Sequence, residues 1–471
     1  MDKDIFLTNS LGNKKEKFIP IDSKKIGMYV CGPTVYDNPH IGNARPLVIF
    51  DILFKVLKCK FGTKAINYVR NITDIDDKII KASFEKKISI TELTNKITKI
   101  FHDDCNYLNC EVPSHEPKAT ENISLMIEMI SKLIKNNNAY ESNQHVYFDV
   151  NKFKDYGKLS NKNLDELISG ARVEVSENKK NPADFVLWKP SSKNEPSWDS
   201  PWGKGRPGWH IECSAMSLKY LGNGFEIHGG GRDLIFPHHE NEIAQSESFT
   251  SKQFAKIWMH VGMITINGEK MSKSVGNVKS VNHVLEDWGP NIIRLFCLSG
   301  SYSKPIDYSE KLLRENITKL RQIESCYYEL RLAVGSGTNS TADKLLDECK
   351  NEFDSALNND FNTPLALTAY YKLIKEVNSL AAEEEITENY AKIILPEFER
   401  MSEILGIDIM KVSDEEKNSI NQMIKKRDEY RIEKNYEEAD KIRDEIAGKN
   451  IIFIDHKNRT TWVKQEKINA E

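Results

Sequence analysis

The sequence lacks several features that would place it in common classes of protein. No apolar run approaches the roughly 18 residues of a membrane span, and residues 1–18 contain no continuous apolar segment like that of a secretory signal. The eight cysteines follow no regular spacing, which argues against a disulfide framework. We therefore expect a cytoplasmic protein without a membrane segment, whose cysteines are free thiols that can bind metal.

An excess of positive charge is also missing, since the formal net charge is -4. Any contact with nucleic acid must therefore come from local basic patches. Hydrophobic residues make up 39% and charged residues 29%, which is typical of folded globular proteins. Because 471 residues exceed what one hydrophobic core usually organises, we expect several domains.

The first hundred residues have the pattern of a nucleotide-binding α/β fold. Residues 28–30 form a short apolar run, and apolar residues recur at helical spacing from 44 to 58. A second strand fits residues 65–69, and a helix follows from about residue 76. This strand–helix–strand–helix order predicts a parallel, doubly wound (Rossmann-like) sheet.

Residues from about 110 to 200 interrupt this rhythm, because prolines separate short mixed elements there. We interpret the segment as an insertion within the nucleotide-binding domain. A strand returns at residues 225–228, ends in three glycines and leads to a helix expected to begin near Pro237.

Beyond residue 308 the sequence becomes strongly helical. Amphipathic runs at 310–334, 344–356 and 364–382 predict a helical bundle, with residues 335–341 as a loop between helices. From about residue 414, a charged helical pair and a hairpin at 451–454 and 460–463 predict a small mixed α/β domain.

His40-Ile41-Gly42-Asn43 lies just after a predicted strand and just before a predicted helix. The start of a helix presents unpaired backbone N–H groups and a partial positive charge, which suit phosphate. Gly42 allows a ligand to approach the backbone closely, and His40 can donate to a phosphate oxygen. Taken alone, however, the four residues fit a capping turn with an exposed histidine better.

A second segment, residues 270–277, carries Lys270, Lys273 and two serines next to a glycine. Such a cationic loop can clamp phosphates, although a solvated basic loop is common and explains the segment when it is considered alone. The two segments occur together, in this order and on these predicted elements. Their combination favours a nucleotide phosphate site.

These two segments resemble the signature motifs of class I aminoacyl-tRNA synthetases, and the similarity to the cysteine-specific members covers most of the chain. The matching segments are residues 28–37, 70–78, 208–216, 228–231, 237–242, 270–274 and 360–364. Two residues depart from the usual pattern. Asn43 replaces a histidine, and Arg459 stands where glycine is usual in a terminal turn.

The resemblance implies a zinc site with the ligands Cys31, Cys213, His238 and Glu242, oriented by His239 and Glu240. The spacing supports part of this set, because His238 and Glu242 are four residues apart on an expected helix and share one face. Thiolate, imidazole and carboxylate are all zinc donors. The residues alone fit ordinary buried cysteines beside an acidic helix start equally well. A zinc-protease motif is excluded, because Ile243 stands where its second histidine would be needed.

The resemblance further implies an enzyme that activates L-cysteine with ATP and Mg²⁺ and transfers it to tRNA(Cys). The implied catalytic residues, which would stabilise the triphosphate and pyrophosphate, are His40, Asn43, Lys270 and Lys273. The implied adenosine contacts are Gly42, Gly229, Gly230, Gly231, Asp233 and Lys273. The implied amino-acid pocket contains Thr73, Trp209 and His228. By themselves, the glycines fit a tight turn and the tryptophan fits a packed core.

The helical bundle resembles the family's stem-contacting domain, and the terminal unit resembles its anticodon-binding domain. The expected domains are the catalytic halves 1–110 and 201–260, the insertion 111–200, the clamp-loop and stem-contact region 261–309, the bundle 310–413 and the terminal domain 414–471. Candidate phosphate contacts, or else a solvated helix face, are Lys425, Lys426, Arg427 and Arg431. Trp462 fits either a base-stacking or a core role. The resemblance suggests a monomer.

Two other functions share much of this pattern. A cysteine ligase with an amino-sugar acceptor would use the same zinc and ATP residues, but a small acceptor does not require the terminal unit. A binding protein that has lost catalysis would keep the fold. The presence of His40, Lys270, Lys273 and all four expected zinc ligands argues against it.

Overall fold

The computed structural model describes residues 4–163, 166, 178–270, 279–335 and 342–470. Lys273 and most of the expected loop 335–341 lie outside these residues, so the predictions made for them stay predictions. Within the described part of the chain, no helix combines the length and the apolar character needed to span a bilayer.

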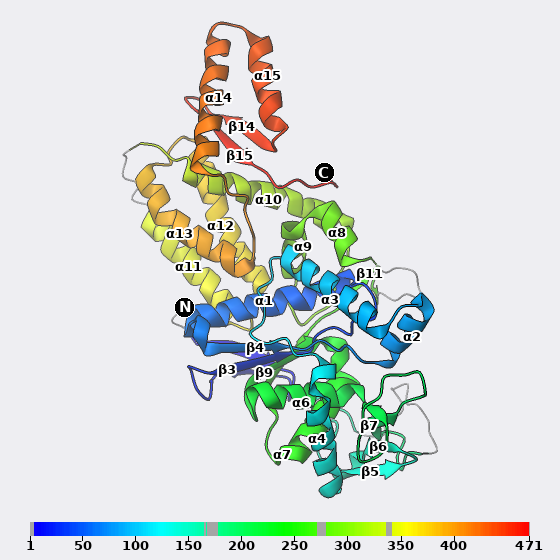
Figure 1. Ribbon diagram of the computed structural model, residues 1–471. Coiled ribbons are helices and arrows are strands. Elements are labelled where there is room, and N and C mark those ends of the chain that lie inside the picture. The colour runs from blue at the N-terminus through cyan, green and yellow to red at the C-terminus, as the bar shows by residue number, and fades with distance from the viewer. Residues whose placement is uncertain (1–3, 164–165, 167–177, 271–278, 336–341, 471) are drawn as a thin grey trace.

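The centre of the fold is a parallel four-stranded sheet (Figure 1). Its strands are β3 (Ile26–Val30), β4 (Ile66–Arg70), β9 (Phe225–Gly231) and β10 (Ala255–Val261), in the spatial order β10-β9-β3-β4. The chain leaves β3 toward β4 on one side and returns as β9 on the other. Ligands of doubly wound folds bind at the carboxyl ends of the strands beside such a reversal.

Helices cover both faces of this sheet. Figure 1 shows α1 (Ile41–Phe61) on one face, and α6 (Trp209–Leu221) and α7 (Glu240–Thr250) on the other. Every residue of β3 is buried, as expected for a strand covered on both sides. Alternate side chains enter different cores, since Met28 joins the apolar cluster around α1 and Tyr29 joins the one around α6 and α7. The predicted doubly wound fold is confirmed.

The segment interpreted as an insertion forms an antiparallel sheet of its own, in the order β5-β6-β7-β8. Its strands are β5 (Ala139–Ser142), β6 (His145–Phe148), β7 (Phe185–Pro190) and β8 (Gly205–Pro207). Helices α2 (Asp77–Lys86), α3 (Ile90–Tyr107) and α4 (Ile123–Lys135) connect β4 to it. Short 3₁₀ turns span Thr63–Ala65, Ala119–Asn122, Val150–Lys152 and Arg232–Leu234.

The helix expected to begin near Pro237 starts later. Residues Ile235–His239 form a π-helical turn in which Phe236 has extended dihedral angles (φ -136°, ψ 132°), and α7 begins at Glu240. The reason is steric, because a proline ring disfavours helical backbone in the residue before it.

Two short strands, β1 (Phe6–Asn9) and β2 (Lys14–Lys17), were not predicted. Strand β2 reads Lys-Lys-Glu-Lys and is fully exposed, so it has no apolar alternation to detect. Strand β1 is fixed by a distant residue, since the Thr8 N–H and hydroxyl both donate to the Asp360 carboxylate, at 2.6 and 2.7 Å.

Beyond β10 the chain passes through a small sheet and two short helices before the bundle. These elements are β11 (Ile264–Ile266), β12 (Glu269–Lys270), α8 (Val281–Trp288), α9 (Pro290–Leu298) and β13 (Ile306–Asp307). The bundle contains α10 (Glu310–Arg331), α11 (Ala342–Asn358), α12 (Thr363–Ala382) and α13 (Glu388–Leu405). The predicted bundle is confirmed, with α13 as an additional helix.

The terminal unit lies at the end of the molecule away from the parallel sheet (Figure 1). It consists of α14 (Asp414–Ile432), α15 (Tyr436–Ala447), β14 (Ile451–Asp455) and β15 (Thr460–Lys464). The helical pair and the antiparallel hairpin agree with the prediction from the sequence.

Candidate active site

The turn before α1 is a capped helix start. His40 is the N-cap residue, and its Nδ1 accepts a hydrogen bond from the Gly42 N–H at 3.1 Å. The side-chain oxygen of Asn43 accepts from the His40 N–H at 3.0 Å, which completes a capping box. Because Nδ1 accepts, the neutral ring carries its proton on Nε2, which can donate to a phosphate. The capping and phosphate-binding interpretations of this turn are therefore compatible.

The three glycines at the end of β9 have different surroundings. A Cβ on Gly229 would lie 2.3 Å from the Phe50 ring, and one on Gly230 would lie 2.9 Å from the His239 ring. These two glycines are buried and allow close packing under the site. Gly231 instead lines the cleft, together with Asp233.

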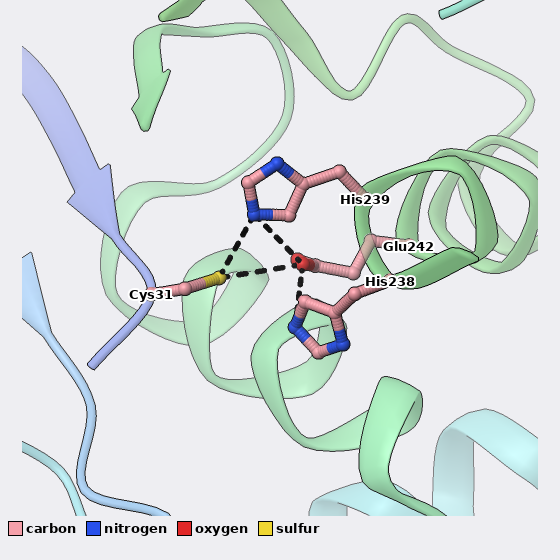
Figure 2. A group of neighbouring side chains, drawn as sticks. All are labelled: Cys31, His238, His239 and Glu242. Atoms are coloured by element: carbon pink, nitrogen blue, oxygen red, sulfur yellow. Dashed lines mark hydrogen bonds and ion pairs between the residues drawn. The ribbon is translucent and has the colours of Figure 1, made fainter. Parts of the chain in front are cut away.

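Sulfur, nitrogen and oxygen donors converge beside the carboxyl end of β3 (Figure 2). The Cys31 Sγ lies 3.4 Å from Glu242 Oε1 and 3.3 Å from His239 Nε2. The His238 Nε2 lies 3.0 Å from the same Glu242 oxygen, and the donor atoms of these four residues all lie within 4.8 Å of one another. Cys213 brings its Sγ to 3.7 Å from that of Cys31.

Three of these separations, at 3.3, 3.4 and 3.7 Å, match those around a tetrahedral zinc ion. Zinc bonds of about 2.0–2.3 Å place neighbouring ligand atoms roughly 3.3–3.8 Å apart. The donor group within 4.8 Å consists of Cys31, His238, His239 and Glu242, and Cys213 adjoins it through its contact with Cys31. The His239 ring has a second contact, because its Nδ1 lies 2.8 Å from Nε2 of the buried His260.

Electrostatics in the cluster keep the Glu242 carboxylate ionised, while Cys31 and His238 hold their protons in the absence of a cation. Burial alone would raise the pKa of Glu242, but the charges of His228 and His238 and their hydrogen bonds outweigh it and lower the pKa to about 2. Burial alone would lower the pKa of His238, but the Glu242 charge and hydrogen bonds raise it to about 10. Burial, and then Cys213, raise the pKa of Cys31 well above its usual value. A bound cation would favour the thiolate of Cys31 and displace the proton from His238.

Two residues predicted for the amino-acid pocket contact the expected metal ligands. The His228 Nε2 lies 2.9 Å from Glu242 Oε2, and its ring stacks on Trp258 with the centroids 4.2 Å apart. Trp209 stacks on His238 with the centroids 4.1 Å apart, and it also lines the cleft. His228 therefore orients the carboxylate, while Trp209 faces both the cluster and the cleft.

Thr73, the third predicted pocket residue, is held in a buried chain of hydrogen bonds. Its hydroxyl donates to Glu212 Oε2 at 2.9 Å and accepts from the Asn71 amide at 3.2 Å. The Asn71 oxygen in turn accepts from the Gly32 N–H at 2.9 Å. Asn71 and Glu212 were not predicted as site residues, because a lone asparagine or glutamate has no distinctive spacing.

The inserted segment fixes the helix that carries the expected ligands. The Glu240 carboxylate accepts hydrogen bonds from the backbone N–H groups of Gly157, Leu159 and Ser160, at 3.0, 3.3 and 2.8 Å. Glu240 therefore anchors the start of α7 to a loop of the insertion, and this sets the position of Glu242 two residues later.

One cleft joins the metal cluster to the turn before α1. Residues that line it include Cys31, Thr34, His40, Gly42, Asn43, Trp209, Gly231 and Asp233. The cleft thus contains members of each predicted set, namely His40 and Asn43 for the triphosphate, Gly42, Gly231 and Asp233 for the adenosine, and Trp209 for the amino acid. Thr73, His228, Gly229 and Gly230 do not line it. Lys270 ends β12, and Lys273 lies beyond the described residues.

One expectation for the terminal unit needs correction, and one open alternative is resolved. Arg427 is only 4% exposed, and its guanidinium bonds to the Asp455 carboxylate, so it does not belong to a solvated helix face. Trp462 is 1% exposed and donates through Nε1 to Asn421 Oδ1 at 3.2 Å, so it has the core role and not the base-stacking one. Both residues are buried for one reason, which is that the hairpin packs against α14.

Comparisons with known proteins agree with this fold. The family described as tRNA synthetases class I (C) catalytic domain matches residues 17–318, and the DALR domain family matches residues 352–409. Methionyl-tRNA synthetase from Mycobacterium tuberculosis, solved with methionyl-adenylate, superposes with a TM-score of 0.60 at 14% identity, over 81% of this chain and 89% of that one. LeuRS of Agrobacterium radiobacter K84, solved in a ternary complex with tRNA and LeuAMS, superposes with a TM-score of 0.59 at 9% identity. The match covers 83% of this chain and 85% of that one. The fold and the domain match define a class I aminoacyl-tRNA synthetase.

Sequence comparison then identifies the branch of that class. The cysteine–tRNA ligase of Pelagibacter ubique is 53% identical over 468 residues, which cover 98% of this chain and 99% of that protein. Those of Geobacillus sp. and Wolbachia pipientis wMel are 44% and 45% identical, each over 97% of this chain and 99% of the relative. The chain belongs to the cysteine–tRNA ligase family.

Proposed function

We propose that this chain is a zinc-dependent cysteine–tRNA ligase whose metal cluster selects the amino acid by its sulfur. It activates cysteine with ATP and transfers it to tRNA, which is the reaction of the family to which it belongs. The observation that carries the proposal is that Cys31 and the His40 turn open onto one cleft.

Selection by sulfur answers a specific difficulty. Cysteine and serine differ by one atom, and a pocket that relies on shape rejects a close isostere by only roughly 10- to 200-fold. When bound, zinc supplies affinity for thiolate over hydroxyl. We propose Cys31, Cys213, His238 and Glu242 as its ligands, with His239 orienting the set from the side of His260.

The remaining cleft residues bind and orient the other reactants. His40 and Asn43 donate to the triphosphate of ATP, which carries Mg²⁺, while Gly231 and Asp233 contact the adenosine. Trp209 and the buried Thr73 chain define the amino-acid side of the cleft. Lys270 and Lys273 neutralise the charge that develops on the departing pyrophosphate. The cysteine carboxylate attacks the α-phosphate, so the protein contributes positioning and charge and no nucleophile of its own.

The rest of the chain contacts tRNA in this proposal. The bundle 310–413 binds the acceptor side of the tRNA, and the unit 414–471 binds the anticodon side, as the family resemblance suggests. From the same resemblance we propose a cytoplasmic monomer, which light scattering across a concentration series would test.

The decisive experiment is ATP–pyrophosphate exchange with cysteine and serine side by side, before and after zinc removal by a chelator. We expect exchange with cysteine to depend on zinc and exchange with serine to stay near background. Exchange that ignored zinc, or that ran equally well with serine, would refute the selection mechanism. Charging of tRNA measured in parallel separates a loss of activation from a loss of transfer.

A further inference from the structure

The chain does not end within the terminal hairpin. After β15, residues 465–470 run back toward the catalytic half of the molecule, and Figure 1 shows the C-terminus near α10 and α8. This segment, called here the tail, has defined contacts at both of its ends.

The first part of the tail joins the bundle to the link between α8 and α9. The Glu466 N–H donates to Glu324 Oε1 at 2.7 Å, and the Glu466 carbonyl accepts from Arg321 at 3.0 Å. Its carboxylate accepts from the side-chain amide of Asn291 at 2.6 Å. A Cβ on Gly289 would lie 2.1 Å from that carboxylate, so the Glu466 side chain packs closely on this link, and the φ of +76° favours glycine there.

The second part of the tail closes on the end of α8. The Asn469 amide donates to the Glu286 carbonyl at 2.7 Å, and the Ala470 N–H donates to the Asp287 carbonyl at 2.9 Å. These bonds satisfy carbonyl groups in the last turn of α8, which have no partner within the helix. Between the two polar anchors, Ile468 is 7% exposed and belongs to the same apolar core as Trp288 of α8.

The other end of α8 meets the phosphate-binding turn directly. The Val281 N–H donates to the Pro39 carbonyl at 3.0 Å, and the Ile41 N–H donates to the Lys279 carbonyl at 2.9 Å. These two bonds pair the start of α8 with the residues on either side of His40. Any displacement of α8 therefore moves the backbone that presents His40 to the cleft.

A helix of eight residues has too few internal hydrogen bonds to be stable or to hold its position without tertiary contacts. Its buried face packs on α1, α3 and α9, and its two ends are held by the tail at one end and by the Pro39–Ile41 turn at the other. We propose that the tail is a brace that positions α8 and, through it, the ATP-binding turn. Glu466 and Asn469 are then positioning residues for ATP. The inference rests on the proposed nucleotide role of the His40 turn.

This brace also links the terminal hairpin to the nucleotide site. Strand β15 runs without interruption into the tail, so the unit proposed to bind the anticodon side and the turn proposed to bind ATP are joined through six residues and one short helix. The connection explains why the tail returns to the catalytic half.

The test compares the full-length protein with a variant that lacks residues 465–471 and with Glu466→Ala. In pyrophosphate exchange we expect the KM for ATP to rise about threefold to tenfold, as the loss of roughly 1 kcal/mol of positioning would give. We expect the KM for cysteine and the zinc content to stay unchanged. Glu466→Gln keeps the acceptor for Asn291 and should restore the KM for ATP. Lys467→Ala, in an exposed position of the same tail, is the matched control.

An unchanged KM for ATP in both the deletion and Glu466→Ala would overturn the brace. So would an equal rise in both KM values, since that indicates general loosening of the fold. If the deletion does not fold, Asn469→Ala and Glu466→Ala decide the question. Calorimetric titration with ATP alone needs no cysteine. A weaker ATP affinity in the variants would therefore support the brace even if cysteine-dependent exchange, and with it the proposed function, failed.

Discussion

The metal cluster and the terminal unit use polar residues in opposite ways. At the cluster, His228, His238, His239 and Glu242 are at most 1% exposed, and each contacts another polar side chain. Most polar residues of α14 and α15 are exposed, and the unit contributes only a small apolar core. Burial fixes the direction of each donor in the first region, whereas the second presents charge to solvent with little geometric constraint. In the proposed function, the first arrangement suits precise positioning of a small reactant, and the second suits contacts that tolerate variation.

The strongest test of this contrast is Cys31→Ser. Replacing a thiolate ligand by a hydroxyl should remove bound zinc and lower cysteine-dependent exchange by more than about 100-fold. Zinc content by elemental analysis and exchange rates measure the two effects. Cys59→Ser, which changes an exposed cysteine, is the matched control and should behave like the parent protein. Normal zinc content in Cys31→Ser would mean that the cluster is not the metal site.

The identity of the fourth ligand gives the next largest effect. If Cys213 is a ligand and His239 an orienting residue, Cys213→Ser should lose stoichiometric zinc. His239→Gln should keep zinc with an affinity weakened by about 10- to 100-fold. Competition with a metal-sensitive dye measures both. The reverse order would identify the four residues of Figure 2 as the ligand set.

In the terminal unit, Arg459→Ala should weaken the binding of tRNA and leave amino-acid activation unchanged. The Arg459 guanidinium contacts Glu329 of α10 at 2.8 Å, and Glu329 is 2% exposed, so the pair docks the hairpin on the bundle. We expect the KM for tRNA to rise about fivefold, which corresponds to about 1 kcal/mol, with exchange unchanged. Arg459→Lys keeps the charge, so its KM for tRNA should lie between that of the parent protein and that of Arg459→Ala. Equal losses in charging and exchange would show that docking does not separate the two regions.

The raised pKa of Glu466 predicts that the stability of the protein depends on pH. Burial, together with the charges of Glu324 and Asp408, raises the pKa of Glu466 from 4.5 to about 7. The hydrogen bond from Asn291 and the charge of Arg321 oppose this rise. The stability it contributes is therefore full below about pH 4.5 and lost as the pH rises through 7. Glu466→Gln cannot lose a proton, so it should gain about 1 kcal/mol over the parent protein at pH 8 and little at pH 5. Denaturant unfolding of both proteins at pH 5 and pH 8 measures this gain. A difference in the free energy of unfolding that is the same at both pH values would contradict the prediction.

The smallest effect is expected on the exposed face of α14. Lys425 is exposed there, and Lys425→Ala should raise the KM for tRNA about twofold and reduce its salt dependence. Glu429→Ala, an exposed change of opposite sign on the same helix, should lower the KM for tRNA. Charging assays over a range of salt concentrations distinguish these shifts from a loss of fold. Two changes in the same direction would argue against an electrostatic contact.

Much of the fold followed from local patterns. Apolar spacing gave the helices of the bundle because their buried stripes repeat along the chain, and the short buried strands marked a covered parallel sheet. The π-helical turn before α7 was missed, although Pro237 signalled it, because an N-terminal proline is also a common helix start. Strand β2 was missed because four charged residues carry no periodic signal.

The sequence by itself determined which chemical groups were available. It supplied the cap residues before α1, the four-residue spacing of His238 and Glu242, and the two segments that pointed to a nucleotide. Each of these depends on neighbours within one helical turn, where backbone geometry fixes the distance.

Only the tertiary structure decided which distant groups meet. It brought Cys31 to Cys213 across 182 positions of sequence, buried Arg427 and Trp462 between α14 and the hairpin, and returned the tail to α8. Such contacts depend on strand order and on the packing of helices over the sheet, and no local spacing encodes them. Short segments of the sequence therefore supply the chemical groups of the site, and the whole fold is required to bring them together.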